Sequence, residues 1–230
     1  MNETLFQAAA LIVPLVTAIV FHEVAHGWTA RALGDPTAAQ LKRLSLNPLR
    51  HVDPVGTILV PGALALAKGP VFGWAKPVPV IKARLRNPRF GMMAVAAAGP
   101  GSNLVLAAIG ALLLGLLVSF YQTATDPSLV ARFVALNLTN FITINVFLAL
   151  FNLLPIPPFD GSHIVEGLLP PAAAAQYERL RPLGFPIMLL LIVVLPWLIP
   201  SFDPVGKLVV PPVQWVTGQY MGLAAWFAGG

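Results

Sequence analysis

The chain has 230 residues, of which 57% are hydrophobic and only 10% are charged, and it contains no cysteine. A soluble domain carries about a quarter charged residues, so this composition excludes an ordinary soluble enzyme, and the high hydrophobicity excludes a disordered chain. The formal net charge of +5 fits the basic cytoplasmic loops of a membrane protein better than nucleic-acid binding. Because there is no thiolate, a bound metal would need His and carboxylate ligands.

Long apolar segments predict an all-α polytopic membrane protein. The first predicted helix starts near Leu5 and extends to about Leu33, and we expect it to be retained, because MNETLF lacks the basic start of a signal peptide. Three further uncharged stretches, 91–121, 133–159 and 183–202, exceed or approach the roughly 20 residues that a membrane-spanning helix needs. The stretch from Leu208 onward is broken by two prolines, which leaves both four and five crossings open.

The basic residues predict the topology. Eleven of the fourteen lie in three loops: Arg31, Lys42, Arg43, Arg50; Lys76, Lys82, Arg84, Arg86, Arg89; Arg179, Arg181. Positive loops stay in the cytoplasm, so we expect a multi-pass protein of the inner cell membrane with all three loops inside. Two of them flank the apolar segment 55–75, which is therefore predicted to enter and leave on one side, as a re-entrant or β-like segment.

Three ionisable residues fall inside the first apolar helix, where such groups are costly and usually functional. His22 and His26 are separated by four residues, so their imidazoles lie on one helical face and can reach a single metal ion. Glu23 lies roughly 100° around the helix from His22. This H-E-x-x-H pattern is typical of zinc proteases, in which the Glu takes a proton from the metal-activated water.

A catalytic zinc site normally has three protein ligands, and Asp160 is the best candidate for the third. Its alternative interpretation is a turn or helix-cap aspartate before Gly161. The predicted topology favours Asp160 as a metal ligand, because a re-entrant segment 55–75 brings Asp160 to the same side and depth of the membrane as the two histidines. A full crossing by that segment would place Asp160 on the opposite face.

Three motifs in this order resemble the site-2 protease family of intramembrane zinc metalloproteases: HEVAH (22–26), AAGPGSN (97–103) and NLLPIPPFDG (152–161). The resemblance implies a site-2-protease-like helical core with one Zn²⁺ per chain, held by His22, His26 and Asp160, with Glu23 as catalytic base. It also implies cleavage of single-span membrane proteins in regulated intramembrane proteolysis, at an active site toward the cytoplasmic side. We expect no PDZ module and no nucleotide-sensing tail.

Two amides match family positions and are predicted to support substrate or transition state, Asn152 and Asn103. Helix–helix hydrogen bonding is the alternative interpretation for both, and for Asn103 it is the favoured one. Asn137, Asn140 and Asn145 are expected to bond to neighbouring helices. His163, His51 and Asp53 are expected to lie outside the metal site.

The resemblance divides the chain into a metalloprotease core over 1–170, with helices at about 91–121 and 133–159, and C-terminal transmembrane or interfacial helices over 171–230. The partners that we expect are a substrate transmembrane helix and the lipid bilayer, and no nucleic acid. We also hypothesise that residues 56–80 supply an edge for extended substrate, although Pro77 and Pro79 argue against long pairing. The alternative function is a membrane metal transporter or metal-binding scaffold that uses the same His and Asp residues.

Overall fold

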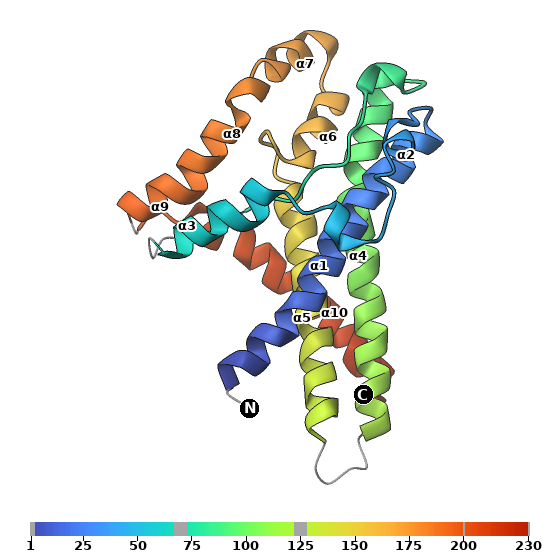
Figure 1. Cartoon of the computed structure of the whole chain (residues 1–230), viewed down its shortest axis with the longest axis vertical. Coiled ribbons are helices and arrows are strands. Elements are labelled where there is room, and N and C mark those ends of the chain that lie inside the picture. The colour runs from blue at the N-terminus through green and yellow to red at the C-terminus, as the bar shows by residue number, and fades with distance from the viewer. Residues whose placement is uncertain (1–2, 67–72, 122–127, 200, 230) are drawn as a thin grey trace.

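The helices follow the predicted apolar segments, and the computed structural model describes residues 3–66, 73–121, 128–199 and 201–229. Three long helices, α1 (Glu3–Ala32), α4 (Pro88–Tyr121) and α5 (Leu129–Asn152), pack side by side (Figure 1). Arg181–Leu198, which comprises α8 (Arg181–Leu189), η4 (Leu190–Val194) and α9 (Leu195–Leu198), is the fourth helix long and apolar enough to span a membrane. No strand occurs in these described ranges, which confirms the predicted all-α polytopic membrane fold.

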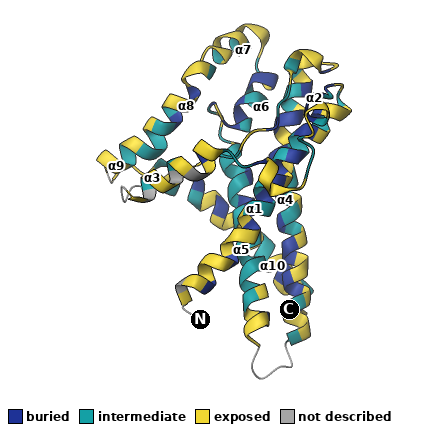
Figure 2. Ribbon diagram, in the orientation of Figure 1, coloured by how far each residue is buried: buried dark blue, intermediate teal, exposed yellow. Residues whose placement is uncertain are grey.

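Small residues allow the long helices to approach closely, as is usual between helices in lipid. The main apolar cluster joins Ala107 and Ala111 of α4, Ile142 and Val146 of α5, and Ala224 of α10 (Val210–Phe227). The C-terminal helix thus packs into the same core as the motif-bearing helices, and it follows η5 (Val205–Val209). The outward faces of the helices are largely exposed apolar side chains (Figure 2), which is the expected surface of helices surrounded by lipid.

The third long helix ends earlier than predicted. We expected a helix over 133–159, but α5 ends at Asn152, and a turn leads to α6 (Asp160–Leu168). Pro155, Pro157 and Pro158 explain the difference, because proline lacks the N–H that a helix interior needs and disfavours helix in the residue before it. Asp160 consequently opens a new helix.

The segment predicted to be re-entrant begins with η2 (Pro54–Leu59) and α3 (Val60–Leu66). Residues 67–72 of this predicted segment lie outside the described residues. The chain then runs extended over 73–81 and makes no ladder. The Trp74 N–H donates to the Gly56 carbonyl at 3.0 Å, so the two ends of the segment lie side by side. Its re-entrant course stays a prediction.

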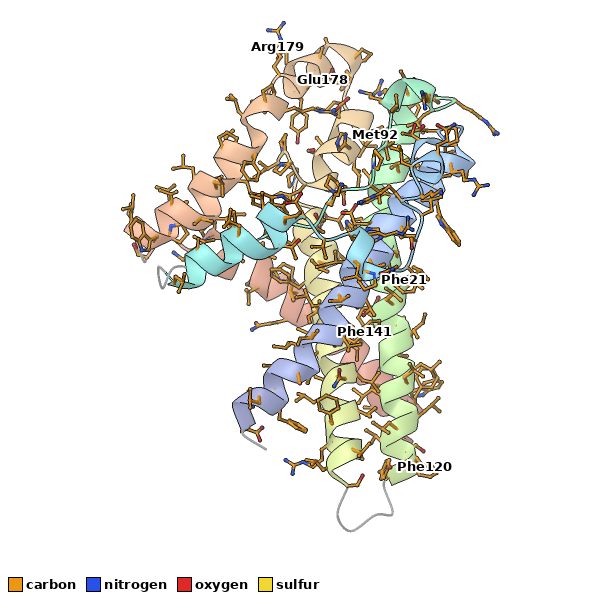
Figure 3. All side chains as sticks on the ribbon, viewed as in Figure 1. Phe21, Met92, Phe120, Phe141, Glu178 and Arg179 are labelled. Carbon is orange, nitrogen blue, oxygen red and sulfur yellow. The ribbon has the colours of Figure 1, made fainter. Side chains whose placement is uncertain are left out.

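Short helices gather with the charged residues at one end of the bundle. They are α2 (Thr37–Gln40), η1 (Pro48–Arg50), η3 (Lys82–Arg84), α6 and α7 (Pro171–Glu178). Figure 3 shows Glu178 and Arg179 at this end and Phe120 at the other. We call the end that carries Arg179 the basic end of the molecule.

Candidate metal centre

The two predicted histidine ligands lie one turn apart on α1. Their ring centroids are 4.7 Å apart and their planes are nearly perpendicular, at 88°. His22 is buried, with 7% of its surface exposed, so its polar nitrogens need partners within the protein.

The third predicted ligand, Asp160, reaches both histidines from the start of α6. Its Oδ2 lies 3.1 Å from His22 Nε2 and 3.3 Å from His26 Nε2. A tetrahedral zinc with bonds of about 2.0–2.1 Å separates its ligand atoms by about 3.3 Å, so this spacing and this donor set fit the ion. Among the described residues, these three form the one group of three or more His, Asp and Glu side chains with donor atoms within 4.8 Å.

The other ring nitrogens of the two histidines are occupied. His22 Nδ1 lies 2.6 Å from Oδ1 of Asn103 on α4, and His26 Nδ1 lies 2.7 Å from the carbonyl of Val95, also on α4. Because both acceptors are oxygens, each ring donates from Nδ1, which leaves Nε2 as the nitrogen that would bind a metal shared with Asp160. Partners of this kind fix the orientation of metal-binding imidazoles.

Gly99 lets α4 pass directly beneath the imidazoles. A Cβ at this position would lie 2.5 Å from His26 Nε2 and 2.7 Å from His22 Cε1, much closer than van der Waals contact. Gly99 lies in the AAGPGSN motif, but this role was not predicted from the sequence. The clustering of small residues in AAGPGSN was the available signal.

Glu23 is held by an extended segment, residues 73–81, that we call the strap. The backbone N–H of Val78 donates to Glu23 Oε2 at 2.8 Å. Toward its start, Lys76 N–H donates to the His51 carbonyl at 2.9 Å, and the guanidinium of Arg43 donates to the Lys76 carbonyl at 2.8 Å. The strap therefore fixes one carboxylate oxygen of Glu23 and leaves the other available.

The far end of the strap is attached to a buried carboxylate, Asp35. Its side chain accepts hydrogen bonds from the backbone N–H of Ile81 at 2.6 Å and of Thr37 at 3.0 Å, and from the Thr37 hydroxyl. Burial raises the pKa of Asp35, but the bonds from Thr37 and Ile81 outweigh it and hold that pKa below its usual value. Asp35 was not predicted from the sequence, because a buried acid that binds backbone donors has no characteristic spacing.

Comparison with known proteins shows the family of the chain. Residues 10–195 match peptidase family M50. The chain belongs to this family. Two relatives of this M50 chain are named as zinc metalloproteases. "Putative zinc metalloprotease YwhC" of Bacillus subtilis is 39% identical over 210 residues, which cover 88% of this chain and 84% of that protein. "Putative zinc metalloprotease Rip2" of Mycolicibacterium smegmatis is 30% identical over 175 residues, covering 76% and 63% respectively.

No solved structure matches the chain. The site-2 protease resemblance that we inferred from the three motifs is confirmed by the family match, and the M50 chain is a multi-pass membrane metalloprotease. The individual roles of its site residues remain predictions.

The remaining predicted residues of the M50 chain lie around this centre. Asn103 contacts a proposed ligand, whereas Asn152 is the last residue of α5 and donates to the Leu148 carbonyl of its own helix. His163 accepts from Arg181 at 2.9 Å, and His51 bonds to the Ser45 carbonyl at 2.7 Å. Neither histidine is part of the group formed by His22, His26 and Asp160.

Proposed function

We propose that this chain is an intramembrane zinc endopeptidase that hydrolyses peptide bonds within or near the transmembrane helices of single-span proteins, in regulated intramembrane proteolysis. One observation carries the proposal. His22, His26 and Asp160 offer three ligand atoms within 4.8 Å of one another inside an apolar bundle, beside a carboxylate, Glu23, that the strap holds in place.

We assign one zinc ion per chain to His22, His26 and Asp160. Zinc in this position would supply Lewis acidity toward a water molecule and toward the scissile carbonyl. Glu23 accepts the proton of the water as the water oxygen attacks the carbonyl carbon. Because Val78 holds Oε2, Oε1 is the atom that takes this proton. Glu23 then returns it to the leaving nitrogen as the C–N bond breaks.

The basic end of the molecule supports an orientation in the inner cell membrane. The basic loops lie there, and positively charged loops are retained in the cytoplasm. We therefore place the active site toward the cytoplasmic side. The substrate helix must unwind locally before cleavage, because each helical carbonyl is already hydrogen-bonded.

A Glu23→Gln variant tests the mechanism. We expect full zinc content and cleavage of a reporter transmembrane peptide reduced by about 10²- to 10⁴-fold, the usual contribution of a general base. Glu178→Gln is the matched control, because the Glu178 side chain is 52% exposed near the basic end. Undiminished cleavage by Glu23→Gln would overturn the mechanism. Zinc uptake into proteoliposomes without any cleavage by the wild type would favour the transporter alternative.

A further inference from the structure

A chain of two buried amides connects the proposed ligand His22 to α5. Asn103 on α4 and Asn145 on α5 both have 0% of their surface exposed. Asn103 Nδ2 lies 2.7 Å from Asn145 Oδ1 and 3.1 Å from the carbonyl of Ala18. Ala18 is one turn before His22 on α1, so Asn103 binds both the imidazole and the backbone that carries it.

These contacts allow one hydrogen-bond direction. Asn145 Nδ2 donates to the Phe141 carbonyl of its own helix at 2.8 Å, which leaves Asn145 Oδ1 as an acceptor toward Asn103. Asn103 must then present its two amide hydrogens to Asn145 and Ala18, because turning its oxygen toward the Ala18 carbonyl would oppose two acceptors. Its Oδ1 is left for His22.

This series of hydrogen bonds ends at the imidazole of His22. An acceptor at Asn103 Oδ1 requires a proton of His22 on Nδ1, which leaves the lone pair of Nε2 for a metal ion shared with Asp160. We propose that Asn145 is a positioning residue, which acts through Asn103 to set the tautomer and orientation of His22. This inference rests on the proposed role of His22 as a metal ligand.

Asn140 provides a matched control on the same helix. Its Nδ2 donates to the Ala10 carbonyl of α1 at 3.1 Å, so it joins α5 to a neighbouring helix through one amide, away from the metal centre. An Asn→Leu change at either position removes one interhelical hydrogen bond and keeps the branching and the number of heavy atoms of the side chain. A purely structural role for Asn145 therefore predicts the same outcome for both variants.

The experiment compares zinc affinity of the full chain in detergent, by competition with a chromophoric chelator. We expect N145L to bind zinc about 10- to 100-fold more weakly than the wild type, because removing a hydrogen-bond partner of a metal-binding histidine generally weakens metal affinity by that factor. N140L should retain wild-type affinity. N145D should restore it, because a neutral carboxylic acid can accept from Asn103 and donate to Phe141. N145A replaces N145L if the larger side chain prevents folding.

Cobalt substitution supplies a second readout, because its visible absorption depends on ligand geometry. The spectrum of N145L should differ from that of the wild type, and the spectrum of N140L should superimpose on it. Equal zinc affinity and equal cobalt spectra for N145L and N140L would overturn the positioning role of Asn145 and leave the proposed metal site standing. Zinc binding that does not change in His22→Ala would instead overturn the proposed metal site.

Discussion

Adding one methyl group at Gly99 should disable the metal centre. The new Cβ of Gly99→Ala would lie 2.5 Å from both Cε1 and Nε2 of His26 and 2.7 Å from Cε1 of His22. Comfortable contact begins at about 3.5 Å, so α4 or the imidazoles must move by about 1 Å. Metal–ligand distances tolerate only about 0.2 Å. A misplacement of about 1 Å commonly costs about 10²-fold in rate.

Gly101→Ala is the control for this prediction. Gly101 lies two residues further along the same helix, and a Cβ there would meet nothing within 4 Å. Replacing a helical glycine by alanine at an open position stabilises by about 0.5–1 kcal/mol. We therefore expect Gly101→Ala to retain zinc and cleavage with an unchanged or higher melting temperature.

Both variants would be measured for bound zinc and for cleavage of the reporter peptide in the same detergent. Gly99→Ala should fold but lose at least about 10²-fold in cleavage together with its zinc. The geometric reasoning fails if Gly99→Ala binds zinc and cleaves as well as Gly101→Ala does.

Two predictions concern the contacts around the centre. Asp35→Ala leaves the buried N–H group of Thr37 and the part-buried N–H group of Ile81 without their acceptor, and the buried one costs about 1–3 kcal/mol. The variant should have lower thermal stability and more proteolysis within the strap, and a wild-type digestion pattern would contradict this. Burial raises the pKa of Glu166, but its bonds and charge interactions with Lys82 and Arg181 hold that pKa below the ordinary 4.5. A group whose pKa is lower in the folded than in the unfolded state stabilises the fold at pH values above its unfolded pKa. This contribution to stability is lost as the pH falls through the folded pKa. The melting temperature of the wild type should therefore fall more between about pH 6 and about pH 3 than that of Glu166→Gln, and parallel curves would refute the assignment.

The sequence predicts the parts of the centre that have a fixed spacing or a composition signal. HEVAH on an apolar helix predicts His22 and His26 as neighbours, and the lack of cysteine with the loop charges points to Asp160. The contacts made by backbone groups are not predictable in this way. Any residue other than proline at position 78 has the N–H that binds Glu23, so Val78 carries no signal.

The amides illustrate a second limit of the sequence. Asn137, Asn140 and Asn145 recur on one helix and were expected to bond to neighbouring helices. Asn140 and Asn145 do so, but Asn137 donates to the Phe133 carbonyl of its own helix. Which amide meets the metal centre depends on the register between α4 and α5, and that register follows from small-residue packing along their whole length.

The proposed ligands are far apart in the sequence, so the metal site can form only after the helices of the chain have packed. His22 and Asp160 are 138 positions apart, and the helices that support them, α4 and α5, lie between them in sequence. A chain emerging into the membrane therefore holds two histidines and a base long before it holds the aspartate that completes the set. Bringing such distant residues together requires the intervening helices to pack first, since the entropy of closing the loop must be offset by their contacts. With the ligands proposed above, a partly inserted copy would lack its third zinc ligand, and it would gain hydrolytic activity only when the bundle closes.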